Sequence, residues 1–307
     1  MNSLNTYIKD PLRIGFGIIR RLAPLFKDDE SYLKILFYLR MHKRLNLKQP
    51  KTYSEKLQWL KLNNHRPEYS IMVDKYAVKD YVTKIIGERY IIPTLGVWDR
   101  PEDIDWDSLP NKFVLKTTHG GGSVGVVICR DKNSFEKEKA IKKLRRSMKQ
   151  DVYMELREWP YKNVSPKVIA EEYIMDDSVY NQGGLSDYKF TCFNGDVDNV
   201  MVCVDRASGT PKFYFYDKQW NLLPLNVRGK NTNKDFKLPK PQCMDEMFEI
   251  ARELSEGIPF LRVDLYCVNN QPYFGELTFF PASGFDSNIL PETEEYFGSK
   301  INLSKIG

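Results

Sequence analysis

The residues best suited to chemistry are concentrated in Phe260–Gly284, a stretch that reads as two alternating strands joined by a short Asn-Asn turn. Because successive side chains of a strand point to opposite faces, Arg262 and Asp264 share one face of the first strand. Glu276 and Thr278 share one face of the second strand for the same reason. Two carboxylates held close together repel unless a cation or a proton lies between them, and Mg²⁺ prefers carboxylate and phosphate oxygens. The stretch therefore predicts a metal site, with a plain hairpin whose charges face solvent as the alternative.

The place of Glu276 relative to Asp264 depends on the length of the turn. A three-residue loop (269–271) would make the two carboxylates cross-strand neighbours, with Cβ atoms about 4.5–5.5 Å apart. A two-residue loop would turn Glu276 to the opposite face, because a slip of one residue inverts a strand. In either case the alternation predicts that Phe274 shares the face of Glu276.

A second group of candidates surrounds a glycine-rich loop. Lys116 ends the strand-like segment FVLK, and GGGSVG follows at residues 120–125. Glycine lets backbone N–H groups approach phosphates, and a nearby lysine neutralises their charge. The loop matches neither the Walker pattern nor the Rossmann pattern. It predicts a phosphate site, with a plain tight turn as the alternative. Lys75, near a helix start, is a weaker candidate whose alternative is a solvated surface charge.

The composition is that of a soluble globular protein with room for a large core. The chain has 307 residues, of which 42% are hydrophobic and 28% charged. The net charge of +5 is mild and spread along the chain. It excludes a nucleic-acid-binding composition but favours an anionic partner, such as nucleotide phosphates, an acidic sugar or a lipid surface.

Cysteine and histidine usage argues against disulfides and zinc. The five cysteines form no C-x-x-C pair, and the three histidines are too few for a His/Cys zinc site. The sequence shows no signal peptide and no apolar run of 18 or more residues. We therefore expect a cytoplasmic protein that spans no membrane. Four cysteines lie in strand-like segments and are predicted to be buried thiols in a reducing compartment: Cys129, Cys192, Cys203 and Cys267.

The chain changes from helical to strand-rich along its length. In the helical first part, Thr52-x-x-Glu55 is a capping box that opens a helix. The stretch Pro11–Phe26 mixes apolar residues with arginines, and it either packs on the domain, which we favour, or lies on the anionic inner face of a membrane. From Phe113 onwards strands and hairpins alternate, with a strong turn signal at Asn194-Gly195. The sum is an α+β fold of antiparallel sheets with packed helices.

Taken in order, the motifs resemble a known superfamily. Asp74-Lys75, FVLK with its glycine loop, AEEYI, DYK, RVD and GE follow one another as they do in ATP-grasp proteins. The surrounding text, including KTYSEKLQWLKL, LPNKFVLKTTHGGG and SDYKFTCFNGDV, is similar to the TupA-like branch of polysaccharide biosynthesis. The resemblance runs from about residue 30 to residue 300 and rests on six motifs in the right order. It implies four parts: a helical N-terminal region (1–70), a segment preceding the ATP-grasp unit (71–112), a small subdomain with the glycine loop (113–175), and a large subdomain with the metal-binding hairpin (176–307).

The resemblance implies a nucleotide site made from three of these motifs. Two lysines would hold the phosphates of ATP under a flexible glycine loop, and AEEYI would be a hinge strand that reads adenine. One of the two aspartates that follow AEEYI would reach the ribose. The nucleotide-binding residues implied are Lys75, Lys116, Gly120, Gly121, Gly122, Ser123, Gly125, Glu171, Glu172, Tyr173, Ile174 and either Asp176 or Asp177.

The resemblance also implies the catalytic and metal-binding residues. Asp264 and Glu276 would bridge Mg²⁺, and Arg262 would steady the transferring phosphate and the oxyanion. Thr278 stands where ATP-grasp ligases usually have an asparagine that binds a second metal, and its hydroxyl would be a weaker ligand. The backbone N–H groups of Ser283-Gly284 could help to bind an oxyanion. Two further residues, Lys189 and Arg206, would contact phosphate or carboxylate.

The function implied by the resemblance is an ATP- and Mg²⁺-dependent carboxylate–amine ligase. It would join a uronic-acid carboxylate of a sugar nucleotide or glycan to an amino acid or amino alcohol through an acyl phosphate. Its partners would be these small molecules, with peripheral contact to the membrane or to polysaccharide-assembly enzymes. The alternatives are a sugar or small-molecule kinase, a non-catalytic nucleotide-binding scaffold, and a glycosyltransferase. The last would need Asp103-x-Asp105 as its metal-binding D-x-D, in a loop that we expect to be a polar surface loop.

Overall fold

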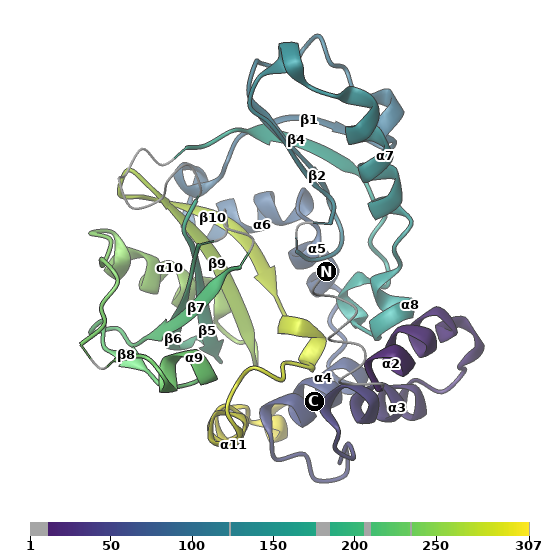
Figure 1. Cartoon of the computed structure of the whole chain (residues 1–307), viewed down its shortest axis with the longest axis vertical. Helices are drawn as coiled ribbons and strands as arrows, with labels where there is room; N and C mark the ends of the chain where they lie inside the picture. Colours follow the sequence, from purple (N-terminus) through teal and green to yellow (C-terminus); the bar gives the residue numbers. More distant parts are fainter. Residues whose placement is uncertain (1–11, 123, 176–184, 206–209, 234, 307) are drawn as a thin grey trace.

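Two antiparallel sheets and a set of N-terminal helices make up the protein (Figure 1). The structure is a computed structural model that describes residues 12–122, 124–175, 185–205, 210–233 and 235–306. The smaller sheet has four strands and the larger has six. Every strand pairing in both sheets is antiparallel, and helices pack on the sheets. The predicted α+β class is confirmed.

The small sheet encloses its own hydrophobic core. Its strands lie in the order β1 (Thr94–Trp98), β4 (Val168–Glu172), β2 (Phe113–Thr117) and β3 (Val126–Cys129). Helix α7 (Lys137–Met148) packs against β2 and β3 and buries Leu144 between them. Strand β1 comes from the segment 71–112, so that segment supplies one edge of this sheet.

The large sheet holds the main core and the metal-binding hairpin predicted from the sequence. Its order is β10 (Gln271–Thr278), β9 (Leu261–Val268), β5 (Asp187–Phe193), β6 (Asp196–Val204), β7 (Lys212–Tyr216) and β8 (Leu222–Leu223). Helix α10 (Met244–Ser255) packs against β5, β6 and β9. The turn between β5 and β6 has positive φ at Asn194 (52°) and Gly195 (85°), which confirms the predicted turn.

The N-terminal region is helical. Its helices are α2 (Leu12–Arg21), α3 (Asp29–Met41), α4 (Tyr53–Asn63), α5 (Glu68–Val73) and α6 (Ala77–Ile86). The predicted capping box is present: Thr52 accepts from the Glu55 N–H, and the Glu55 carboxylate accepts from the Thr52 N–H. Later in the described part of the chain lie three further α-helices, α8 (Val152–Leu156), α9 (Val227–Lys230) and α11 (Pro291–Lys300). Helix α11 packs on α4.

Helix α2 packs on the protein with one face only. Phe16 and Ile19 contact the cluster under α3, whereas Ile14 and Ile18 are 48% and 50% exposed. Within the described residues, no helix has both the length and the apolar character needed to cross a bilayer. All five cysteines are buried and none forms a disulfide, which confirms the prediction that Cys129, Cys192, Cys203 and Cys267 are buried thiols.

Candidate functional site

The turn of the hairpin β9–β10 has two residues, which is the shorter of the two lengths that the sequence left open. Asn269 and Asn270 both have positive φ, 51° and 62°, as in the type I′ turns that match the twist of paired strands. Gln271 already belongs to β10 and pairs with Val268. With this turn alone, the simple alternation of a strand would place Glu276 in the core.

A β-bulge at Gly275 restores the pairing of the two carboxylates. The register shifts between Phe274 and Glu276, so that Glu276 lies opposite Asp264. An extra residue in one strand reverses the faces beyond it. Phe274 is therefore on the core side and 5% exposed, and the prediction that it shares the face of Glu276 is wrong. Glycine is required at the bulge, because a Cβ there would lie 2.9 Å from the Asp264 carbonyl oxygen.

Asp264 is held between two cationic side chains. Arg262 binds both of its oxygens, with Nε–Oδ1 at 2.6 Å and Nη2–Oδ2 at 2.8 Å, and Lys189 contacts Oδ2. Asp264 is 2% exposed. Burial alone would raise the pKa of Asp264, but Arg262 and Lys189 outweigh it and hold that pKa below its ordinary value. Burial would likewise lower the pKa of Lys189, and Asp264 raises it.

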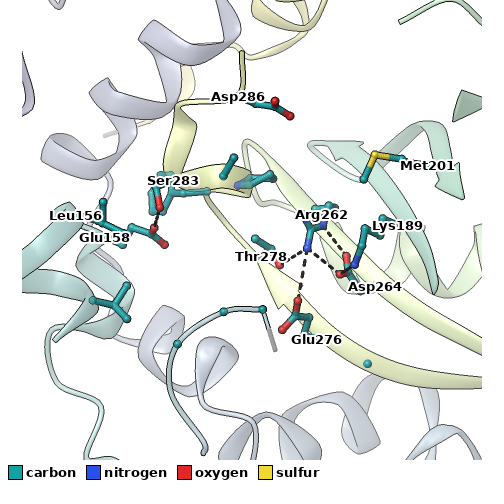
Figure 2. Close-up of a pocket in the computed structure, with 18 of the residues that line it drawn as sticks. Leu156, Glu158, Lys189, Met201, Arg262, Asp264, Glu276, Thr278, Ser283 and Asp286 are labelled. Atoms are coloured by element: carbon teal, nitrogen blue, oxygen red, sulfur yellow. Dashed lines mark hydrogen bonds and ion pairs between the residues drawn. The ribbon is translucent and has the colours of Figure 1, made fainter. Parts of the chain in front are cut away.

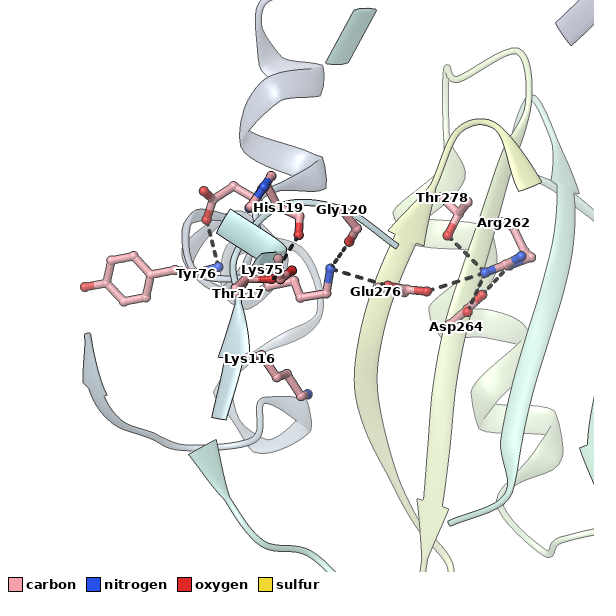
Figure 3. A network of polar contacts seen from close by, with 12 residues as sticks. Lys75, Tyr76, Lys116, Thr117, His119, Gly120, Arg262, Asp264, Glu276 and Thr278 are labelled. Carbon is pink, nitrogen blue, oxygen red and sulfur yellow. Dashed lines mark hydrogen bonds and ion pairs between the residues drawn. The ribbon is translucent and has the colours of Figure 1, made fainter. Parts of the chain in front are cut away.

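Lys75 connects the glycine loop to the hairpin (Figure 3). Its Nζ donates to the carbonyl oxygen of Gly120 at 2.5 Å and lies 3.8 Å from Glu276 Oε2. Glu276 Oε1 in turn lies 3.5 Å from Arg262 Nη2, which also donates to Thr278 Oγ1 at 3.1 Å. Burial lowers the pKa of Lys75, and Glu276 opposes that shift. Charged groups from the segment before α6 and from the large sheet thus form one continuous row.

Lys116 is positioned by a buried carboxylate of the small sheet. Glu171 on β4 is 4% exposed and contacts Lys116 on one side and Lys79 on the other, with Lys79 Nζ–Oε1 at 2.6 Å. Lys79 is fixed in turn by the carbonyl oxygen of Ile92 at 2.7 Å and the hydroxyl of Thr94 at 2.8 Å. Burial would raise the pKa of Glu171, but the two lysines lower it. Lys79 was not marked by the sequence, in which it reads as an ordinary helix lysine.

Lys75, Lys116 and the charged residues of the large sheet line one open pocket between the two sheets (Figure 2). Its volume is about 610 Å³. The lining includes the predicted residues Lys75, Lys116, Gly120, Gly121, Gly122, Lys189, Arg262, Asp264, Glu276 and Thr278. Four acidic lining residues were not singled out from the sequence: Glu155, Glu158, Asp187 and Asp286. Asp187 stands beside Lys189 in the DYK motif, whereas the other three stand in no motif that chemistry would single out.

Other predicted residues lie away from the pocket or outside the described residues. Glu171 reaches the site only through Lys116, and Glu172 is exposed on the opposite face of β4. Gly125 closes back onto β2, where a Cβ would lie 2.0 Å from Thr117 Oγ1. Tyr173 and Ile174 follow the end of β4 and are partly buried. Ser123, Asp176, Asp177 and Arg206 fall outside the residues that the structure describes.

Hydrogen bonds test two weaker expectations. Asp103 forms a two-point ion pair with Arg100, and Asp105 accepts from the backbone of its own turn, so the D-x-D segment is a surface loop as expected. The N–H of Ser283 donates to the Phe280 carbonyl oxygen at 2.8 Å. The N–H of Ser283 is therefore engaged within the turn, whereas the binding of an oxyanion by the N–H of Gly284 stays a prediction.

The donors of the hairpin fit a Mg²⁺ ion that shares its ligands with phosphate. Among the described residues there is no group of three or more His, Cys, Asp or Glu side chains arranged to hold a metal. Mg²⁺ commonly takes one or two carboxylates and completes its shell with phosphate oxygens and water. Asp264 and Glu276 supply that number on adjacent strands, and the nearest cationic nitrogen to Glu276 is 3.5 Å away.

Lys116 from the small sheet, Lys75 from the segment before α6 and carboxylates from the large sheet converge on a single pocket, and this arrangement is that of an ATP-grasp protein. The profile of the TupA-like ATPgrasp family matches residues 55–302. The chain therefore belongs to the TupA-like ATP-grasp family. The suspected family and the predicted fold are confirmed.

Several solved ligases resemble the chain at low sequence identity. D-alanine–D-alanine ligase from Bacillus anthracis is 16% identical, with a TM-score of 0.42, and the match covers 75% of this chain and 66% of the ligase. The same enzyme from Helicobacter pylori is 16% identical, with a TM-score of 0.43 and coverage of 81% and 69%. An L-amino acid ligase from Bacillus licheniformis is 14% identical, with a TM-score of 0.44 and coverage of 85% and 57%. The chain thus spans about two thirds of the length of the first two. No curated protein sequence matches it.

Proposed function

We propose that the chain joins the carboxylate of a uronic acid to an amino acid or a small amino alcohol, using ATP and Mg²⁺. The uronic acid would be part of a sugar nucleotide or a glycan in the biosynthesis of a cell-surface polysaccharide such as capsule or O-antigen. The family name and the sequence resemblance support the substrate class. The observation that carries the reaction class is the set of cationic side chains that line one pocket beside two carboxylates: Lys75, Lys116, Lys189 and Arg262.

The reaction would proceed in two displacements. A carboxylate is a poor electrophile, so its oxygen first attacks the γ-phosphorus of ATP and the bond to ADP breaks. The amine, an ammonium ion at neutral pH, gives one proton to solvent; its nitrogen then attacks the acyl carbon of the resulting acyl phosphate, the bond to phosphate breaks, and the nitrogen loses a second proton to the released phosphate. Both steps gather negative charge in one place. Cationic side chains fixed in advance stabilise that charge, and binding both substrates in one pocket supplies their orientation.

The row from Lys75 to Arg262 is the part of the chain best placed for phosphoryl transfer. Lys75 and Lys116 would hold phosphates under Gly120–Gly122, and Arg262 would steady the group that is transferred. Asp264 and Glu276 would hold Mg²⁺, with Thr278 as a weaker ligand. When bound, the ion would neutralise charge between neighbouring phosphates.

The remaining predicted contacts stay part of the proposal. The segment Glu171–Ile174 would read adenine, and Asp177 would reach the ribose. Ser123 and Arg206 would contact phosphates. We place the reaction in the cytoplasm, which five buried thiols support. The exposed apolar side chains of α2 leave room for peripheral contact with the membrane.

Product analysis tests the proposal. The purified protein would be incubated with Mg-ATP, a panel of UDP-uronic acids, a lipid-linked or polymeric uronate, and a panel of amines. ADP and phosphate that appear only when both a uronate and an amine are present would establish the ligase and name its substrates. ADP with a phosphorylated sugar and no requirement for an amine would show a kinase, and release of UDP would show a glycosyltransferase. Either of these results would overturn the proposal.

A further inference from the structure

The pocket has a second polar end, which the phosphoryl-transfer chemistry does not use. Glu158 lies just before the turn η5 (Trp159–Tyr161) and lines the pocket, although the residue is only 7% exposed. Its Oε1 accepts a 2.5 Å hydrogen bond from Ser283 Oγ. Figure 2 shows this carboxylate across the pocket from Arg262, with Thr278 between them.

Ser283 is held in a strained backbone conformation by buried side chains. Ala282 and Ser283 have φ of 48° and 56°, in the left-handed region that favours glycine. Gln58 Nε2 donates to the carbonyl oxygens of Ser283 (3.1 Å) and Gly284 (2.9 Å), and Lys61 Nζ donates to Ser283 O at 2.8 Å. Strained residues of this kind persist where the surroundings fix them, and they cluster at functional sites. Helix α4 therefore fixes the turn that positions the Ser283 hydroxyl against Glu158.

Lys61 interacts electrostatically with the buried carboxylate of Glu158. Its Nζ donates to the backbone oxygens of Leu156 (2.9 Å) and Ser283, and it lies 4.7 Å from the ring centroid of Phe285. Burial lowers the pKa of Lys61 to about 7. Burial also raises the pKa of Glu158, and Lys61 and Ser283 oppose that shift. The hydrogen bonds of the lysine thus go to the backbone, and the carboxylate stays at the pocket wall.

The two ends of the pocket carry different sets of charged side chains. Lys75, Lys116, Lys189 and Arg262 line one end together with Asp187, Asp264 and Glu276, whereas Glu155, Glu158 and Asp286 line the rest of the pocket together with Arg20. Glu155 is paired with Arg20, and the side chains of that pair are 33% and 34% exposed, so Glu158 is the most buried acidic side chain of the three. An ammonium group is the complement of a desolvated carboxylate.

We propose that Glu158 binds the ammonium group of the amine substrate, with Ser283 as its positioning residue. The assignment rests on the proposed function and narrows its second substrate to a primary amine that enters the pocket with its positive charge. It also gives the two substrates separate ends of one pocket. Tyr161, whose pKa is raised by burial and then by both Glu158 and Glu276, is buried within electrostatic range of both ends.

Saturation-transfer NMR with small amines tests the assignment without requiring the uronate or ATP. Ethanolamine and glycine are the probes, and ethylene glycol is the uncharged counterpart. We expect saturable binding of at least one of the two amines to the wild-type protein and none of ethylene glycol. Glu158→Gln should weaken amine binding about tenfold or more, since it removes a charge-assisted hydrogen bond. Glu158→Asp keeps the charge and should retain part of the affinity.

Glu294→Gln is the matched control. Glu294 is also 7% exposed and accepts from a serine hydroxyl, Ser54 Oγ at 2.6 Å, but it lies outside the pocket lining. This variant should bind the amines as the wild type does. The proposal is overturned if neither amine binds the wild type, if Glu158→Gln binds as tightly, or, should that variant not fold, if Glu158→Asp shows no loss. Binding of a non-hydrolysable ATP analogue, measured separately, reports on the proposed function, so the two can fail independently.

Discussion

The two sheets each bury one carboxylate between two cationic side chains, yet the two clusters have different surroundings. In the small sheet, Glu171 lies between Lys79 and Lys116 and is 4% exposed. Lys79 is tied to the backbone at Ile92 and to the Thr94 hydroxyl, so this cluster is closed on the side away from the pocket. Its one contribution to the pocket is the ammonium group of Lys116.

In the large sheet, the corresponding cluster opens onto the pocket. Asp264 is as deeply buried, but Arg262 and Lys189 both line the pocket beside Glu276. In both clusters burial alone would raise the pKa of the carboxyl, and the cations hold that pKa down. The comparison shows that the same local electrostatics serves two purposes: Glu171 positions a side chain, and Asp264 is part of the reacting surface.

The largest expected effect lies in the open cluster. Glu276→Gln should reduce ATP turnover on the order of 10²–10³-fold and leave the fold intact, because the side chain is 29% exposed and its role is charge. ADP release and circular dichroism measure the two properties. Glu253→Gln, at an exposed position of α10, is the control and should change neither the ATP turnover nor the fold. Unchanged turnover in Glu276→Gln would exclude the assigned metal site.

The next largest effect concerns Lys116, the residue of the closed cluster that lines the pocket. Lys116→Ala should raise the KM for ATP about tenfold or more and lower kcat, since a charge-assisted contact with phosphate is lost. Steady-state kinetics with ATP varied measures both constants. Lys112→Ala, an exposed lysine just before β2, should change neither. A change confined to the KM of the carboxylate or of the amine would contradict the role given to Lys116.

A stability effect should distinguish Glu171 from its neighbour. Glu171→Gln leaves two buried lysines without their carboxylate and should lower the free energy of unfolding by about 3–5 kcal/mol. Urea denaturation measures that loss. Glu172→Gln, at the exposed neighbouring position, should stay within about 0.5 kcal/mol of the wild type. Equal stability of the two variants would show that the closed cluster has no structural role.

We expect the effect of Glu171→Gln on the free energy of unfolding to depend on pH. The pKa of Glu171 is lowered from 4.5 in the folded state. Its stabilisation is therefore present above about pH 4.5 and is lost as the pH falls through the folded-state pKa. The difference in unfolding free energy between wild type and Glu171→Gln should shrink as the pH falls below that value. A difference that grows on acidification would reverse the sign of the assigned shift.

The smallest effect concerns the geometry of the open cluster. Gly275→Ala places a Cβ 2.9 Å from the Asp264 carbonyl oxygen, and the shift that follows should cost about 1–3 kcal/mol of stability. It should also lower kcat, because Glu276 is the next residue. Gly17→Ala, where no atom lies within 4 Å of the added Cβ, is the control. Thermal unfolding and ADP release at one temperature compare the two variants.

The sequence predicted the charged residues of the open cluster and part of its geometry. Arg262, Asp264 and Glu276 stand in short motifs on strands, where the two-residue period states which face each side chain takes. That period gave the wrong answer for Phe274, because a bulge adds a residue that alternation does not count. The length of the turn was left open by the sequence, and two asparagines with positive φ form the two-residue turn.

The rest of the site depends on contacts between residues far apart in the chain. Lys79 reads as an ordinary helix lysine, and only the position of β4 brings Glu171 to it. Glu158 and Ser283 are 125 residues apart and meet because α4 fixes the turn after β10. Local patterns contain no information on such meetings, so these residues could be found only from the folded chain.

The bulge at Gly275 has a consequence for how related hairpins should be aligned. On β10, the residues before the bulge and the residues after it alternate between the two faces in opposite phase. A single alternation along the whole strand therefore assigns one of the two parts to the wrong face. A related hairpin that lacks residue 275 would pair regularly and would still place Glu276 opposite Asp264 and Leu277 opposite Val263. An alignment that sets its gap in the Asn-Asn turn would therefore match letters whose side chains point in opposite directions.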